Sequence, residues 1–231
     1  MPTLTEYKER IAQHFSDTEP APWNWVFYGD SITHGAAHTH GWRSFPEIFG
    51  ERVRWELMRK TDVIINTAFS GKTACELAEK AYFDLHVTRF APNAVFLLIG
   101  TNDIVKTPGG VGAFQEYLDS IAEKIVALGA IPVIQNYPPI LKAPENAGYM
   151  ARYEKMPLYN KAIEETAQKY NAIFVDHWSH WTAHASHPRF LDHWQGETIH
   201  PGARGHFEMA VTIFKTLGIY SEDSLCSHIF N

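Results

Sequence analysis

Residues 26–33 read Val-Phe-Tyr-Gly-Asp-Ser-Ile-Thr, and this stretch decides how the chain folds. An apolar and aromatic run ends abruptly in Gly29, Asp30 and Ser31. Such a run is typical of a buried β-strand, and the small residues after it are typical of a turn. The stretch therefore predicts a strand that delivers the Ser31 hydroxyl to the edge of a sheet. The alternative is a serine that only caps the next helix.

Four further apolar runs predict strands. The five expected strands are Trp25–Tyr28, Val63–Asn66, Ala94–Ile99, Pro132–Gln135 and Ile173–Val175. They are continuous rather than alternating, which is the pattern of strands covered on both faces of a parallel sheet. Apolar residues at helical spacing lie between or beside them, over 4–15, 114–128, 156–170 and 207–217. Strands that alternate with helices predict an α/β fold with right-handed crossovers.

Turn residues follow each of the first three expected strands. They are Gly-Asp-Ser at 29–31, Ala-Phe-Ser-Gly at 68–71 and Ile-Gly-Thr-Asn-Asp at 99–103. In parallel sheets ligands bind at the carboxyl ends of the strands, near the switch in strand order. The three segments should therefore meet at one edge. We interpret Asp30 and Asp103 as turn or capping residues there.

A serine hydroxyl is a weak nucleophile and needs a base and an acid from elsewhere in the chain. His200 is the candidate general base, and the following Pro201 favours a helix start immediately after it. Glu197 is the candidate acid that would orient the His200 ring. Asp192 is its rival on the same segment, and a Ser–His dyad held by a backbone carbonyl is the remaining alternative.

The four segments, in this order, resemble the SGNH (GDSL-type) hydrolase family. The Ser, Gly, Asn and His of the family name map onto Ser31, Gly71, Asn102 and His200. The Gly-Asp-Ser and Gly-Thr-Asn-Asp blocks are the specific part of the match. The family usually carries Asp three residues before the His, where this chain has Glu197.

The resemblance implies a fold and a site. The fold is a flavodoxin-like three-layer α/β/α sandwich with strand order 2-1-3-4-5, and we expect residues 1–231 to form a single such domain. The oxyanion hole would consist of the Ser31 and Gly71 N–H groups and the Asn102 side-chain amide. These residue types suit that task, because glycine permits close approach and asparagine donates without a charge.

Composition excludes several other classes of function. The net charge of −6 and the lack of a basic cluster argue against nucleic-acid binding. No apolar stretch reaches the length of a membrane span, and residues 1–10 lack a signal-peptide apolar region. We therefore expect a cytoplasmic protein with no membrane partner, the alternative being a protein whose signal peptide has been removed. Two cysteines make no disulfide framework.

Histidine is frequent, with 13 residues, which raises the possibility of a metal site. Histidines after the first strand could meet those after the fifth: His34, His38 and His40 with His177, His180, His184 or His187. The chain has no His-Glu-x-x-His motif and no cysteine ligand pair. We therefore expect no metal and no cofactor.

Three long loops are expected around the serine, over residues 32–43, 136–149 and 176–197. Their aromatic rings could stack on sugars, shape an acyl pocket or only pack the loops onto the scaffold. These rings are Trp42, Tyr137, Tyr149, Trp178, Trp181 and Trp194.

The sequence predicts a serine esterase that works through an acyl-enzyme. Its substrates would be small-molecule or carbohydrate esters with a short acyl group such as acetyl. The alternatives are a lipase or lysophospholipase, and a non-catalytic flavodoxin-like carbohydrate-binding domain.

Overall fold

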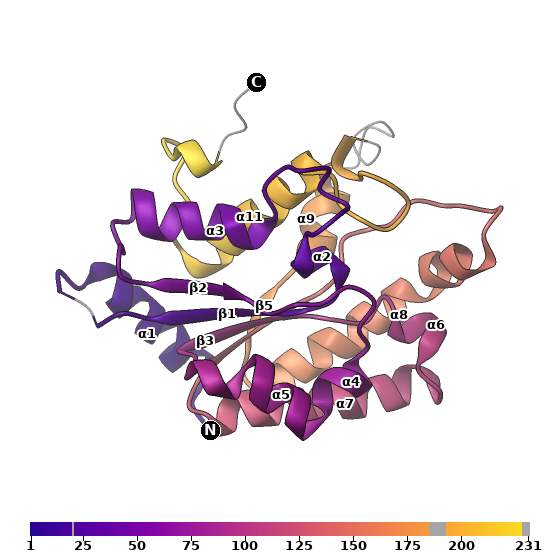
Figure 1. Cartoon of the computed structure of the whole chain (residues 1–231), viewed down its shortest axis with the longest axis horizontal. Helices are drawn as coiled ribbons and strands as arrows, with labels where there is room; N and C mark the ends of the chain where they lie inside the picture. Colours follow the sequence, from indigo (N-terminus) through magenta and orange to yellow (C-terminus); the bar gives the residue numbers. More distant parts are fainter. Residues whose placement is uncertain (20, 185–192, 228–231) are drawn as a thin grey trace.

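A five-stranded parallel sheet runs through the middle of the protein (Figure 1). The computed structural model describes residues 1–19, 21–184 and 193–227. The strand order is β2-β1-β3-β4-β5, as predicted. The strands are β1 (Asn24–Gly29), β2 (Val63–Asn66), β3 (Ala94–Leu98), β4 (Ile131–Gln135) and β5 (Ile173–Val175). Each expected strand is confirmed to within one residue at either end.

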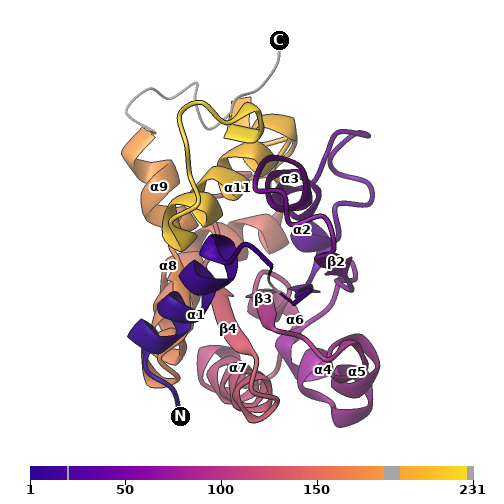
Figure 2. The same cartoon turned by 90° about the vertical axis from the view of Figure 1, so that its left-hand side faces the viewer.

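Helices cover both faces of the sheet and make the predicted three layers. Helices α3 (Phe45–Glu51) and α11 (Ala203–Leu217) lie on one side, and α4 (Ala74–Ala78), α5 (Lys80–His86) and α7 (Gly110–Ala127) on the other (Figures 1 and 2). Helix α1 (Leu4–Ser16) contacts α11, and α8 (Ala147–Lys169) contacts α7. Shorter elements are α2 (Ser31–His34), η1 (Arg52–Glu56), η2 (Thr88–Phe90), α6 (Asp103–Lys106), α9 (His177–His184) and η3 (Leu225–Ser227).

The four expected helices are confirmed, but three of them begin earlier than their apolar stripes. The stripe at 156–170 belongs to α8, which already starts at Ala147 because the Asn146 side chain accepts hydrogen bonds from the first turn. The early turns of α7 and α11 carry small or polar residues, which leave no apolar periodicity to detect. The expected loop over 176–197 also contains a helix, α9.

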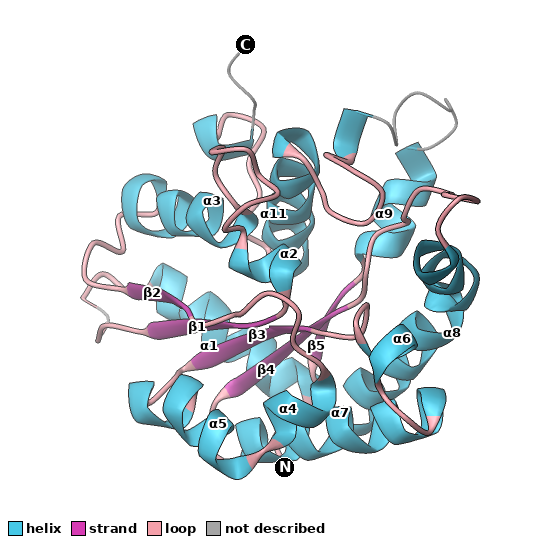
Figure 3. Cartoon of the chain, turned by 45° about the vertical axis from the view of Figure 1, so that its right-hand side comes forward, coloured by secondary structure: helices cyan, strands magenta, loops and turns pink. Residues whose placement is uncertain are grey.

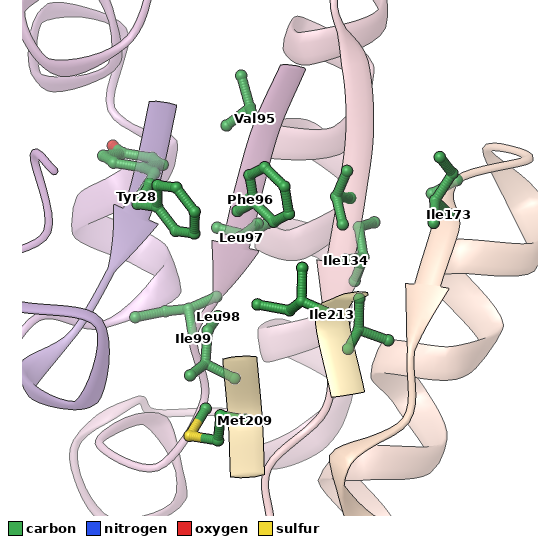
Figure 4. Packing of buried hydrophobic residues seen from close by; sticks show 14 of the residues in the cluster. Tyr28, Val95, Phe96, Leu97, Leu98, Ile99, Ile134, Ile173, Met209 and Ile213 are labelled. Carbon is green, nitrogen blue, oxygen red and sulfur yellow. The ribbon is translucent and has the colours of Figure 1, made fainter. Parts of the chain in front are cut away.

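Burial of the inner strands explains their continuous apolar pattern. Every residue of β3 and β4 is buried, and Phe27 of β1 stacks on Phe96 of β3 with ring centroids 4.4 Å apart. In Figure 4, Met209 and Ile213 of α11 lie against side chains of the inner strands. Edge strand β2 is covered less, and Val63 is 47% exposed. The sheet is thus rigid at its centre, where β1 and β3 end.

Two predictions from composition concern membrane-spanning helices and the cysteines. Across the described residues, no helix is both long and apolar enough to cross a membrane. Cys75 and Cys226 are free thiols, as expected from the cysteine count.

Candidate active site

The segments that follow β1, β2 and β3 meet at one edge of the sheet. Figure 3 shows α2 and α6 beside the loops that leave the carboxyl ends of the strands. The Asn102 side chain, after β3, donates to the Lys72 carbonyl, after β2, at 3.0 Å. Ser31, after β1, is hydrogen-bonded to His200. The predicted convergence is therefore present in the fold.

Ser31 is the first residue of α2 and is delivered by a tight turn. At the end of β1, a Cβ on Gly29 would lie 2.3 Å from the Leu98 carbonyl oxygen, so only glycine can pass there. The Asp30 side chain then accepts a hydrogen bond from the Ile32 N–H at 3.1 Å and caps α2. The result is a Ser31 side chain held at the surface of a buried turn, 9% exposed.

Ser31, His200 and Glu197 form one chain of hydrogen bonds. The Ser31 Oγ lies 2.8 Å from His200 Nε2. On the opposite side of the ring, His200 Nδ1 is hydrogen-bonded to a Glu197 carboxylate oxygen. A carboxylate at Nδ1 keeps the proton there and leaves Nε2 free to accept the hydroxyl proton. Asp192, the rival acid, lies outside the described residues.

A short hairpin holds Glu197 and His200 face to face. Gln195 pairs with Pro201 in an isolated antiparallel bridge, and the Gly202 N–H donates to the Trp194 carbonyl at 2.9 Å. This bridge corrects the expected helix start at Pro201. Helix α11 begins only at Ala203, because residues 195–202 are used to close the hairpin.

Two of the expected oxyanion donors lie at this edge, Gly71 after β2 and Asn102 after β3. Gly71 has φ +84°, a conformation that favours glycine. Asn102 is 8% exposed and uses one amide hydrogen for the Lys72 carbonyl. Since a carboxamide carries two N–H donors, the second can serve a ligand. Lys106 Nζ donates to the Gly71 carbonyl at 2.8 Å and fixes the same turn.

Asp103 stabilises the segment that follows the Gly71 turn. Its side chain is fully buried and accepts hydrogen bonds from the Ala74 N–H at 2.9 Å and the Thr107 hydroxyl at 2.7 Å. Asp103 therefore caps α4, as the capping interpretation anticipated, although it does so across to a neighbouring helix. Burial raises the pKa of Asp103 to about 6, and the hydrogen bonds from Thr107 and Ala74 only partly oppose this rise.

Asp103→Asn should change how stability depends on pH. The pKa of Asp103 is higher in the folded protein than the ordinary value of 3.8 for an aspartate, so wild-type stability falls as pH rises from about 4 to 6. The difference in unfolding free energy between the variant and the wild type should therefore shift in favour of the variant by on the order of 3 kcal/mol between pH 4 and 7. Urea unfolding at several pH values measures this difference.

Asp84→Asn is the matched control for that series. A hydrogen bond from Lys80 lowers the pKa of the exposed Asp84 carboxyl. The stability of Asp84→Asn relative to the wild type should therefore fall as pH rises through the acid range. A stability difference for Asp103→Asn that stays constant from pH 4 to 7 would contradict the raised pKa.

Asp30 links the ends of three strands beneath the nucleophile. Its buried carboxylate accepts hydrogen bonds from the Thr101 hydroxyl at 2.9 Å and from the Tyr137 hydroxyl. Burial raises the pKa of Asp30, and the hydrogen bonds from Tyr137, Ile32 and Thr101 act in the opposite direction. Asp30 is thus a structural brace, consistent with the turn interpretation.

Three of the six loop aromatics are buried and are not available to contact a ligand. Tyr137 and Trp181 are completely buried and Trp194 is 3% exposed, which places these three rings in the core. Trp42 is 63% exposed, and Tyr149 and Trp178 are half-buried. For these three buried rings the alternative of packing the loops onto the scaffold holds, and loop length alone could not show which rings fold inward.

Phe69 is an exposed aromatic residue that the sequence analysis did not include among the candidate ligand-contacting rings. It immediately precedes Ser70 and Gly71, and its ring is 55% exposed. The ring stacks on His34, whose Nδ1 lies 3.1 Å from the Ser70 hydroxyl. Its place two residues before Gly71 was a signal available in the sequence.

The histidines meet in a different combination from the one considered. His38 stacks on His200, with ring centroids 3.4 Å apart. His177 is hydrogen-bonded to Gln135, and His180 to Glu208. The pairing that was considered as a possible metal site is therefore not the one formed by His38, His177 and His180, and His187 lies outside the described residues.

Among the described residues, His38, Glu197 and His200 are the group whose possible metal-ligand atoms all lie within 4.8 Å. Both ring nitrogens of His200 already have partners, Ser31 and Glu197. The His38 and His200 rings are parallel within 3°, so their nitrogen lone pairs do not converge on one point. The arrangement fits proton transfer to and from Ser31 better than metal coordination.

Comparison with known proteins agrees with this geometry. Residues 27–206 match the model of the GDSL-like Lipase/Acylhydrolase family. An uncharacterized protein of Mycoplasma pneumoniae is 35% identical over 103 residues, which span 43% of this chain and only 11% of that protein.

Solved structures share the fold at low sequence identity. A protein of Parabacteroides merdae described as a GDSL-like lipase superposes with a TM-score of 0.72 at 19% identity, over 87% of this chain and 97% of its own. A catalytic mutant of Axe2, an acetylxylan esterase of Geobacillus stearothermophilus, gives a TM-score of 0.70 at 19% identity, with the same coverage.

Proposed function

This chain belongs to the GDSL-like lipase/acylhydrolase family and is an ester hydrolase, and from that premise we propose that it is a serine esterase for short-acyl esters such as acetylated carbohydrates. The observation that carries the proposal is the hydrogen-bonded chain from Ser31 through His200 to Glu197. The proposed donors Gly71 and Asn102 follow β2 and β3, the two strands that flank β1 in the sheet. The acetylxylan esterase among the similar structures supports the choice of acetyl esters but does not identify the alcohol part.

The proposed reaction begins when Ser31 Oγ attacks the ester carbonyl carbon. His200 Nε2 takes the hydroxyl proton, and Glu197 holds the imidazolium that forms. The Ser31 and Gly71 N–H groups and the Asn102 amide donate to the negative oxygen of the tetrahedral intermediate. His200 then gives its proton to the leaving alcohol oxygen, and the acyl group stays on Ser31.

Deacylation repeats these steps with water. His200 removes a proton from the water molecule as its oxygen attacks the acyl carbon, and the same donors stabilise the second oxyanion. Collapse of the intermediate returns the proton to Ser31 Oγ and releases the acid. No cofactor takes part in this scheme.

The surroundings of Ser31 favour a short acyl group. The exposed Phe69 ring, on the segment after β2, stacks on His34 of α2 and has the Lys72 ammonium over its face, so these two neighbours are polar rather than aliphatic. We therefore expect acetyl and butyryl esters to be cleaved with higher kcat/KM than octanoyl or longer esters.

A series of aryl esters of graded chain length, together with acetylated sugars, tests the substrate proposal. Each methylene buried in an apolar groove contributes about 0.8 kcal/mol, or roughly fourfold in kcat/KM. A value that rises steadily from acetyl to decanoyl would instead assign the protein to the lipases or lysophospholipases.

Asn102→Ala should lower kcat by about 10²–10³ with little change in KM. The side-chain amide is proposed to contact the oxyanion, which exists only after Ser31 attacks. Steady-state kinetics on an acetyl ester measures both constants. Asn171→Gly, at the amino end of β5, is the control and should keep the wild-type rate. An effect of Asn102→Ala on KM alone would mean that the amide only binds the ground-state ester.

A further inference from the structure

The imidazole ring of His38 lies flat on the ring of His200. The two centroids are 3.4 Å apart and the ring planes differ by 3°. Both edges of the His200 ring are already hydrogen-bonded, to Ser31 and to Glu197. His38 therefore covers one face of the proposed general base, a position from which it can affect the charge on that ring without touching the substrate.

Local backbone structure fixes His38 in this position. The turn around it is closed by hydrogen bonds from the His40 N–H to the Ala37 carbonyl and from the Thr39 hydroxyl to the Gly35 carbonyl. Thr39 is 3% exposed and anchors the turn. On the other side, the His38 carbonyl packs so close to Gly196 that a Cβ there would lie 3.3 Å away. The stack is thus built from both segments.

We propose that His38 is a positioning residue for ester hydrolysis, whose neutral ring stabilises the imidazolium that His200 becomes when it takes the Ser31 proton. The proposal rests on the proposed role of His200 as the base. Two neutral aromatic rings prefer offset or edge-to-face arrangements over a face-to-face stack. A cation over the face of an aromatic ring is attracted to it, and the attraction is larger where water is excluded. The observed stack therefore becomes favourable at the moment when His200 is charged.

The arrangement works only if His38 is neutral while His200 is charged. Burial lowers the pKa of His38, the neighbouring His200 lowers it further, and Glu197 opposes them. Exposed His40, on the same turn, also lowers the pKa of His38.

Three other titratable groups interact electrostatically with the stack or with Glu197. They are His206, Asp30 and the half-buried Arg152, a cation that interacts with both Glu197 and Asp30. Buried His206 faces both rings, and burial lowers its pKa to about 3, which keeps it uncharged. The buried Asp30 carboxyl interacts electrostatically with His200. His206 therefore adds no positive charge beside the one that arises on His200 during the reaction.

Three substitutions of His38 test separately the effects of its aromatic face, its charge and its size. His38→Phe keeps an aromatic face, His38→Leu removes it, and His38→Lys replaces it with a cation. On the pH-independent part of the profile, we expect Phe to keep kcat within about threefold of wild type. Leu should lower kcat by about 3- to 30-fold with KM nearly unchanged. Lys should be lower than Leu, and added salt should restore part of its rate.

His40→Asn is the matched control, because His40 is exposed on the same turn, has φ +52° and tolerates asparagine there. It should keep the wild-type kcat. Thermal unfolding of each variant shows whether a loss of rate comes from a loss of structure. If His38 had only a structural role, its substitution would lower the melting temperature. It would not make the kcat of His38→Leu higher than that of His38→Lys, or make the kcat of His38→Lys depend on salt.

Two results would overturn the inference while leaving the esterase proposal intact. They are a wild-type kcat for His38→Leu, and equal losses for the Phe, Leu and Lys variants. A different result would overturn the serine mechanism on which the inference rests: ester hydrolysis that survives removal of the Ser31 hydroxyl, measured on the same substrate in the same series.

Discussion

Ser31→Ala should lower ester turnover by about 10⁴- to 10⁶-fold, because it removes the only atom proposed to form a bond to the acyl group. The fold should be retained, since the Oγ of Ser31 has His200 as its partner and the turn is held by Asp30. Hydrolysis of an acetyl ester measures the rate. Labelling by an organophosphonate, located by mass spectrometry, shows which serine is activated.

Ser70 offers a matched control for this experiment. Its hydroxyl also lies near a histidine, with His34 Nδ1 at 3.1 Å, but this pair is exposed. Ser70→Ala should keep most of the activity and all of the labelling at Ser31. Turnover by Ser31→Ala at near the wild-type rate would end the nucleophile assignment. A wild-type protein that takes up no organophosphonate and cleaves no ester would favour the binding-domain alternative.

Glu197→Gln should have the second-largest effect, lowering kcat by about 10³–10⁴. The neutral amide no longer stabilises the imidazolium and can present an N–H to Nδ1, which favours the wrong tautomer of His200. Glu197→Asp should be partly active, because it restores the residue usual for the family but shortens the side chain. Kinetics on the same acetyl ester compares both variants.

The comparison that decides the acid is with Asp192→Asn. If Glu197 orients His200, this change should cost far less than Glu197→Gln. The reverse ranking would transfer the role to Asp192. Near-wild-type rates for both variants would leave a Ser–His dyad in which a backbone carbonyl holds the ring.

The fold was predictable because its signals are local. A buried parallel strand shows as a short apolar run, and the five runs match β1 to β5. The turn residues after the first three strands meet because parallel strands end at the same edge. The start of α8 was not predictable from its stripe, since its first turns are stabilised by the Asn146 cap rather than by a continuous apolar face.

What the sequence could not show depends on packing between distant segments. Tyr137 and Trp42 both lie in loops that follow strands, yet one ring is completely buried and the other is 63% exposed. His38 is one of several histidines in its loop, and only the folded hairpin around Gly196 brings it onto His200. Spacing along the chain carries no information about such contacts.

The brace beneath Ser31 has a consequence for engineering. Asp30, Thr101 and Tyr137 tie the ends of β1, β3 and β4 together through buried hydrogen bonds. Phe69 and Trp42 have exposed rings and lie on the loops that follow β2 and β1. Substrate choice can therefore be altered by exchanging surface side chains while the reacting oxygen keeps its place. A library that diversifies these loops and leaves the buried carboxylate untouched is the natural starting point for changing which esters are cleaved.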